Sequence, residues 1–313
     1  MPIIVDYLSQ IIILKINHWN QIIIPVKVTA KFPAMVHSNL VIADAHVHIH
    51  PCFDLDDLLD GAVKNFSLQA NQGVDLEEYQ FVLLLTETST DKVFRQLYNR
   101  AKNNTYLHQN EDNWQIYLTR EDCSVYAQST DGREIYIIAG SQIVVAENLE
   151  VLALGTADKI PDGQPLATVV EKVIDHGGIP VIPWGFGKWL GKRGKILSNF
   201  LSKNDISQLF LGDNSARPIF WFQPTFFQTA KKLGLRILPG TDPLPFPSEA
   251  SRAGSFGFTL EGNLNPQKPA ESLKQLLRQS SAQPQAYGSL ENPWRFIRNQ
   301  IAMQLVKRQR TTA

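Results

Sequence analysis

The fold and the site predicted for this chain rest mainly on one stretch, Leu40-Val-Ile-Ala-Asp44-Ala-His46-Val-His48-Ile-His50. Its first four residues are apolar and indicate a buried strand. Because side chains alternate between the two faces of a strand, Asp44 and the three histidines are expected on one face. Imidazole is the commonest transition-metal ligand, and two imidazoles two residues apart on a strand can converge on one ion. The pattern therefore predicts a metal or catalytic site.

A helix is expected directly after this strand. Asp54 can cap it, and apolar residues recur at helical spacing between Leu55 and Phe66. The histidines then lie at the C-terminal end of the first strand of a βα unit, where α/β folds build their sites. Cys52 lies beside them and is either a further ligand or, more in keeping with its size, a small buried residue.

The composition is that of a globular chain. Its 313 residues, 43% of them hydrophobic and 19% charged, suffice for one large α/β barrel or two modest domains. Thirty basic and thirty acidic residues give a net charge of zero, so no overall field favours nucleic acid or an anionic membrane as partner. Two cysteines provide no disulfide framework. We therefore expect a cytoplasmic protein without a nucleic-acid or membrane partner.

The first 34 residues differ from the rest. Isoleucine runs at 11–13 and 22–24 are interrupted by polar and charged residues, so no segment approaches the roughly 20 apolar residues of a membrane span. No cationic region with a small-residue cleavage site indicates a signal peptide. Residues 1–34 are predicted to be a dispensable extension, and residues 35–313 a single domain.

Strands and helices are predicted to alternate along the rest of the chain. The apolar runs that predict further strands lie at 81–85, 135–138, 151–154, 179–182, 209–211, 219–222 and 235–238. A polar and aromatic segment at about 102–134 predicts a small antiparallel insertion with a hairpin at Asp131-Gly132, and a final helix is expected over about 293–310. The predicted fold class is α/β, a distorted (β/α)7-8 TIM-like barrel with a small β insertion.

Acidic residues follow several predicted strands and would share the mouth of such a barrel. Asp242 follows an apolar strand and precedes Pro243, and it is expected to be a metal ligand or a general base. Glu147, just beyond its strand, is a second candidate for both roles. Glu87 and Asp213 occupy similar positions, although acids there more often cap helices or face solvent.

A glycine-rich, cationic segment at 184–195 is expected to bind substrate. Glycine lets the backbone approach a ligand closely, and Lys and Arg donate to carboxylate or phosphate oxygens. Loops rarely leave tryptophan to solvent, which also favours a binding role over a solvated, flexible loop. The predicted substrate-binding residues are Trp184, Lys188, Arg193, Asp213 and Arg217.

Four motifs follow one another between residue 41 and about residue 260. They are Asp44-Ala-His46-Val-His48, Gly140-Ser-Gln142-Ile with Glu150-Val-Leu-Ala-Leu-Gly155, His176-Gly-Gly-Ile-Pro-Val-Ile182, and Leu238-Pro-Gly-Thr-Asp242-Pro. In this order they resemble the PHP (polymerase and histidinol phosphatase) superfamily and, more distantly, the amidohydrolases. The resemblance implies a distorted (β/α)7 barrel, a metal centre at the strand C-termini and, most commonly, phosphoester hydrolysis.

The chain departs from the family pattern at several ligand positions. Gln142 stands where the family has glutamate, and Trp184 and Leu244 stand where it has histidines. A full three-metal site is therefore not expected. The ligands that the resemblance leaves are His46, His48, Asp242 and Glu147, around one divalent ion (Zn, Mn or Fe) with open positions for water.

The expected function is that of a metal-dependent hydrolase acting on a phosphoester or another anionic small molecule. Asp242 or Glu147 would take the proton of the metal-bound water. The alternative is a degenerate PHP-like barrel that binds a ligand or partner without metal catalysis. A lyase or isomerase on the same scaffold also stays open, because a fold does not determine its chemistry.

Overall fold

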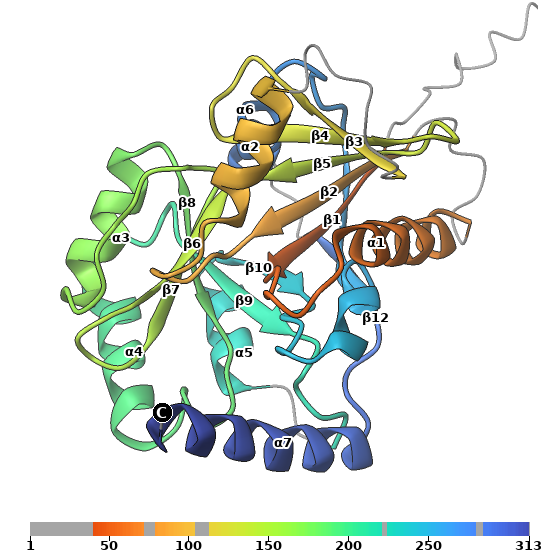
Figure 1. Ribbon diagram of the computed structural model, residues 1–313. Helices are drawn as coiled ribbons and strands as arrows, with labels where there is room; N and C mark the ends of the chain where they lie inside the picture. Colours follow the sequence, from red (N-terminus) through yellow and green to blue (C-terminus); the bar gives the residue numbers. More distant parts are fainter. Residues whose placement is uncertain (1–39, 72–78, 104–112, 221–223, 280–283, 313) are drawn as a thin grey trace, which may run out of the picture. The chain divides into compact units, whose positions relative to one another are not determined.

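The computed structural model describes residues 40–71, 79–103, 113–220, 224–279 and 284–312 (Figure 1). The extension predicted at 1–34 lies outside these ranges, as do residues 104–112 of the predicted insertion. No helix within them combines the length and apolar character needed to cross a membrane.

Seven strands form the first sheet, in the order β12-β11-β1-β2-β5-β4-β3. They are β1 (Leu40–Val47), β2 (Tyr79–Leu85), β3 (Trp114–Leu118), β4 (Ser124–Ser129), β5 (Glu134–Ile138), β11 (Phe256–Glu261) and β12 (Gln285–Gly288). The β1–β2 and β2–β5 pairs are parallel and the other pairs are antiparallel. The hairpin expected at Asp131-Gly132 is present between β4 and β5, where Gly132 adopts a φ of 86°.

Five strands form the second sheet, in the order β10-β9-β8-β7-β6. They are β6 (Gly140–Val144), β7 (Glu150–Leu154), β8 (Ile179–Pro183), β9 (Phe210–Asn214) and β10 (Arg236–Gly240). Strands β8, β9 and β10 run parallel, whereas β7 is antiparallel to both of its neighbours.

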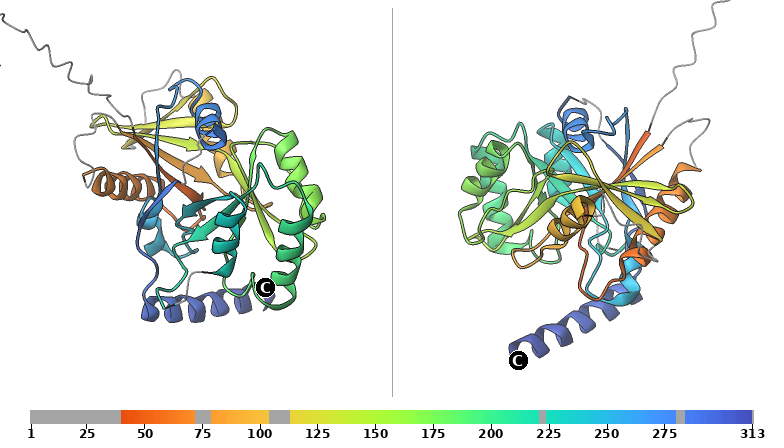
Figure 2. Two further views of the ribbon diagram at one scale, coloured as in Figure 1. Left: turned by 180° about the vertical axis from the view of Figure 1, so that it is seen from behind. Right: turned by 45° about the horizontal axis from the view of Figure 1, so that its top comes forward.

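Helices cover the faces of the two sheets, except for the last one, which extends away from them (Figure 2). They are α1 (Leu55–Ala70), α2 (Val93–Asn103), α3 (Leu166–Asp175), α4 (Gly191–Lys203), α5 (Thr225–Lys232), α6 (Pro269–Gln279) and α7 (Pro293–Thr312), with a short 3-10 helix, η2 (Pro247–Arg252). The predicted cap of α1 is confirmed, since the Asp54 side chain accepts from the Asp57 N–H at 3.1 Å. Helices α3, α4 and α5 flank the five-stranded sheet (Figure 2).

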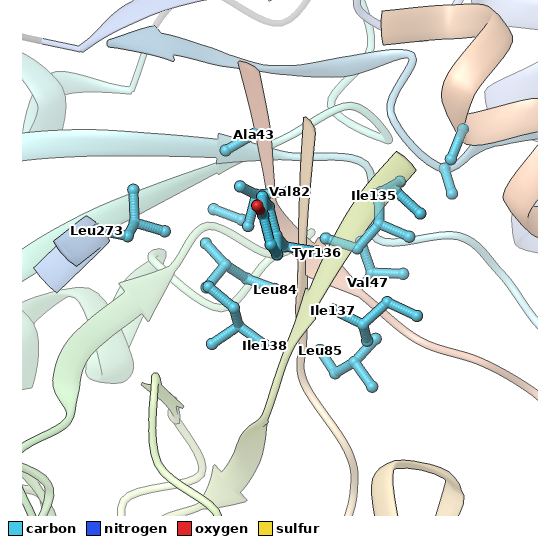
Figure 3. Close-up of a cluster of buried hydrophobic side chains, with 14 of the residues drawn as sticks. Ala43, Val47, Val82, Leu84, Leu85, Ile135, Tyr136, Ile137, Ile138 and Leu273 are labelled. Carbon is cyan, nitrogen blue, oxygen red and sulfur yellow. The ribbon is translucent and has the colours of Figure 1, made fainter. Parts of the chain in front are cut away.

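Both faces of the seven-stranded sheet are apolar in its centre. Leu84 and Ile138 point to the side of Leu273 from α6, while Leu85 and Ile137 point to the opposite side (Figure 3). Helix α1 packs against β1, β2 and β5. A second apolar cluster joins the five-stranded sheet to α3, α4 and α5. Burying each such side chain fully contributes about 1.5–3 kcal/mol.

The predicted TIM-like barrel is wrong. In the described parts of the chain the strands form two mixed sheets, and no ladder closes them into a barrel, so the fold is α+β. A parallel barrel needs a helix after each strand. Residues 114–154 are described throughout and instead carry five successive strands with no helix between them. The second neighbour of β1 is the antiparallel strand β11, not β10.

The two sheets approach each other at the ends of β1 and β10. The N–H of Asp242, just after β10, donates to the carbonyl of His46 at 2.7 Å. A Cβ atom on Gly240 would lie 2.3 Å from the backbone nitrogen of His46, so this approach requires glycine. On the other side, the N–H of Glu87 after β2 donates to the carbonyl of Gly140 at 3.1 Å. Residues distant in sequence therefore meet at one place.

Candidate metal centre

Two histidines and one aspartate converge where the sheets meet. His46 and His48 lie at the end of β1 and are buried, and their Nε2 atoms are 3.2 Å apart. The Oδ1 atom of Asp242 lies 3.6 Å from Nε2 of His46 and 3.5 Å from Nε2 of His48. These three atoms all lie within 4.8 Å of one another, and no other group of three such side chains is found in the described residues.

Neutral polar side chains surround these three residues. The Oε1 atom of Gln142 lies 3.1 Å from Nε2 of His46, and the hydroxyl of Thr86 lies 3.5 Å from Nε2 of His48. The amide of Asn214 donates to Oδ2 of Asp242 and thereby leaves Oδ1 turned to the histidines. Asn214 was not among the predicted site residues, although its place at the end of β9 is where α/β sites are commonly built.

The electrostatics of the site favour the protonation states of His48 and Asp242 that can bind a cation. Burial and the neighbouring His46 lower the pKa of His48 to about 4. Burial alone would raise the pKa of Asp242, but the charges of His46, His48 and Lys188 and the Asn214 hydrogen bond hold it below its usual value. At neutral pH His48 is then a neutral imidazole and Asp242 a carboxylate, which are the protonation states that metal ligation requires.

Asp242 has an unusual backbone conformation. Its φ is 50°, in the left-handed region that few residues other than glycine adopt. Such a conformation costs on the order of 1–3 kcal/mol and is often found at functional sites. The hydrogen bond from its N–H to the carbonyl of His46 holds the backbone in place, so the carboxylate is fixed relative to the histidines.

Asp44 joins the elements that carry the site and lies outside the three-residue group. Its carboxylate is completely buried and accepts from the N–H groups of His46, Thr241 and Gly254, at 3.1, 2.9 and 2.9 Å. The hydroxyl of Thr241 donates to it at 2.5 Å. Burial raises its pKa to about 6 despite these donors. Asp44 therefore fixes the backbones that carry His46 and Asp242.

His50 is adjacent to the group but faces a different partner. Its Nε2 atom lies 3.0 Å from the carbonyl oxygen of Pro243, and its ring stacks on that of His48 with centroids 5.4 Å apart. This contact orients the His48 ring, whose Nδ1 atom is buried and has no hydrogen-bond partner among the described residues.

Glu147, predicted as a ligand and base, does not belong to the three-residue group and contacts the start of a helix instead. Both of its carboxylate oxygens accept from the N–H of Leu166, at 3.1 and 3.0 Å, at the start of α3. Glu87 acts similarly at α2, where it accepts from the N–H of Phe94 at 2.5 Å. Each acid satisfies a backbone donor that the helix itself leaves unpaired. Capping therefore explains both residues.

Three of the predicted substrate-binding residues are engaged within the fold. Asp213 accepts from Nε and Nη2 of Arg217, at 2.9 and 2.7 Å, and both side chains are largely buried. Arg193 donates to the carbonyls of Gly187 and Asn148, at 3.0 and 3.3 Å. These contacts hold the loops that border the site, and the role of the three side chains in binding an anionic substrate stays a prediction.

Lys188 and Trp184 differ in their access to the site. Lys188 forms an ion pair with Glu150, and its charge also acts on Asp242, whose pKa it helps to lower. Trp184 is buried in the apolar cluster of the five-stranded sheet, and its backbone N–H donates to the carbonyl of Gly212 at 2.8 Å. Lys188 is therefore the predicted binding residue best placed to meet a ligand, whereas Trp184 is part of the core.

Comparisons with known proteins leave the family open. No protein-family model matches the sequence, and no curated protein matches it significantly. Among solved structures, the chain is similar to the crystal structure of PsfC from Pseudomonas syringae PB-5123, with 14% sequence identity and a TM-score of 0.49. The match covers 87% of this chain and 99% of that one. The resemblance to the PHP superfamily stays a prediction.

Proposed function

We propose that His46, His48 and Asp242 bind one divalent transition-metal ion, and that the protein is a metal-dependent hydrolase. The observation that carries the proposal is the spacing of the three donor atoms, at 3.2, 3.5 and 3.6 Å. Tetrahedral ligands at about 2.0–2.2 Å from an ion lie about 3.3–3.6 Å from one another. Two imidazoles and one carboxylate suit Zn, Mn or Fe.

The residues around the proposed metal site have different roles. A divalent ion bound there supplies an activated water and a positive charge for an oxygen that becomes anionic. Asn214 holds Oδ2 of Asp242, and Gln142 presents a neutral oxygen beside His46. With three protein ligands, a coordination position is left for water or substrate.

An anionic small molecule, most simply a phosphoester, is the substrate class that we propose. Lys188 supports it, because its charge already acts on Asp242 and its partner Glu150 can be exchanged for a substrate anion. Lys188→Gln is expected to raise KM for a phosphorylated substrate more than for a neutral ester. The two free cysteines, Cys52 and Cys123, support a reducing compartment, and we propose the cytoplasm.

Metal analysis of the purified full-length protein tests the metal site. After incubation with Zn²⁺, Mn²⁺ or Fe²⁺ and dialysis, we expect about one ion per chain, as one four-coordinate site requires. His46→Ala and Asp242→Ala should abolish binding. His176→Ala is the matched control, because this histidine also faces an aspartate, Asp158, at 3.7 Å but belongs to no three-residue group.

Two results would contradict the proposal at different levels. If none of these ions binds or raises the melting temperature, the metal site is wrong. If an ion binds but neither phosphoesters nor neutral esters are hydrolysed, the site holds metal without hydrolytic activity.

A further inference from the structure

The net charge of zero conceals an uneven distribution of charge. Residues 184–204 contain five basic residues and no acidic one, and the same is true of α7, residues 293–312. Together these 41 residues hold ten of the thirty basic residues and none of the thirty acidic ones. Two segments that are far apart in sequence are therefore both purely cationic.

The same segments, together with the turn at 219–220, expose large apolar side chains. We call six of them the α7 surface, each between 48% and 82% exposed: Phe186, Leu190, Phe220, Trp294, Ile297 and Ile301. Three of these, at 294, 297 and 301, follow helical spacing and form one stripe along α7.

Phe296 joins the three parts of this surface. It is itself buried, and its ring lies 5.3 Å from that of Phe186 and 6.2 Å from that of Phe220, between ring centroids. The loop after β8, the turn at 219–220 and the start of α7 are thus neighbours. The C-terminal part of α7 stands away from both sheets (Figure 2).

We infer that the α7 surface docks on an anionic lipid bilayer. A helix at a membrane surface inserts its apolar side chains at the headgroup boundary, while Lys and Arg attract acidic headgroups. Trp294, the most exposed of the six, is a residue type enriched at that boundary. Arg298 is exposed one helical turn after it, and Lys192 and Lys195 are exposed on α4. Lys188 and Arg295 pair with acidic residues of other segments, so the exposed Arg298, Lys192 and Lys195 supply the charge that complements such a bilayer.

Charge argues against a second copy of this chain as the occupant, and the exposed apolar side chains argue against a nucleic acid. A second copy of this chain would bring the same cationic segments face to face, and like charges suppress such pairing. A nucleic acid would use the cations, but the exposed aliphatic side chains of Leu190, Ile297 and Ile301 have no partner on a phosphate backbone. The inference does not depend on the metal site.

Vesicle flotation with the full-length protein tests the docking. We expect binding to vesicles of phosphatidylcholine and phosphatidylglycerol, weaker binding as salt rises, and little binding to pure phosphatidylcholine. Trp294→Ser with Ile297→Ser should reduce partitioning on the order of tenfold, and Arg298→Gln roughly fivefold. Melting temperatures should stay near that of the wild type, because all three side chains are exposed.

Matched controls lie on α1, where Leu68 and Lys64 are also exposed. Leu68→Ser and Lys64→Gln should leave partitioning unchanged. Four results would overturn the inference: equal binding to neutral vesicles, equal loss in the α1 variants, no loss in the α7 variants, or a dimer or a DNA complex that only the α7 variants abolish.

Discussion

Gln142 places a neutral amide oxygen where a charged ligand would strengthen the proposed metal site. Its Oε1 atom lies 3.1 Å from Nε2 of His46. Gln142→Glu adds a negative charge beside the ion and is therefore expected to raise the affinity for Zn²⁺ by roughly tenfold or more. Competition with a chromophoric chelator measures this affinity. Gln142→Leu is the control for size, and an unchanged affinity in Gln142→Glu would show that this side chain does not face the ion.

The residues at the end of β1 show which contacts between individual residues can be predicted from the sequence. Strand alternation and the chemistry of imidazole correctly brought His46 and His48 together, and Asp242 joins them as expected. The role of Asp44 was not predictable, because two of its partners, Thr241 and Gly254, lie 197 and 210 residues away in sequence. Local periodicity contains no information on such contacts.

Helix α3 provides a test that separates capping from metal binding. Because Glu147 accepts from the N–H of Leu166 at the start of this helix, Glu147→Ala should cost about 0.5–2 kcal/mol of stability and leave the metal content unchanged. Urea unfolding and metal analysis of the same sample measure both effects. Glu171→Ala, an exposed acid within α3, is the control and should change neither. A loss of metal in Glu147→Ala would show that Glu147 is a metal ligand after all.

The positions of strands were largely predictable, whereas their partners were not. Apolar runs at 81–85, 135–138 and 179–182 lie on strands of the structure, and the run at 235–238 begins one residue before β10. The strand predicted at 219–222 is wrong, because residues 219–220 form a turn. Such runs show that a segment is buried, but they do not distinguish a parallel neighbour from an antiparallel one. The barrel prediction assumed parallel pairing throughout. It failed at residues 114–154, where turns replace helical connections.

A buried charge network connects η2 to the start of α7. Glu249 is fully buried and accepts from Arg295 at 2.6 Å and from Arg252 at 2.9 Å. Arg252 also donates to Glu291 at 3.0 Å. Burial alone would raise the pKa of Glu249, but the two arginines hold it below the ordinary value of 4.5.

This network predicts part of the pH dependence of stability. A carboxylate whose pKa is lower in the folded state stabilises the fold above its unfolded pKa, and this contribution disappears as pH falls through the folded pKa. Glu249→Gln should therefore destabilise the protein by about 1–3 kcal/mol at neutral pH, because it removes the carboxylate that accepts from both arginines and leaves Glu291 as their acidic partner. The difference from the wild type should shrink below pH 4.5. Urea unfolding over a pH series measures it, and a difference independent of pH would contradict this account.

The net charge of the whole chain hides how its charges are distributed along the sequence. A net charge of zero led to the expectation of no membrane partner, yet ten basic residues and no acidic ones lie in two segments that meet at Phe296. The net charge is zero as counted, but it does not show which charged segments the fold brings together.

The three proposed ligands come from both sheets: His46 lies on β1 of the seven-stranded sheet and His48 directly after it, whereas Asp242 is the second residue after β10 of the five-stranded sheet. An ion bound there would cross-link the two sheets. Without the ion, we expect each sheet to unfold locally on its own. Amide hydrogen exchange should reveal this as a change in cooperativity. Without metal, the amides of β8, β9 and β10 should exchange faster than those of β1 and β2. With saturating Zn²⁺, both sets should slow to one common rate, that of global unfolding.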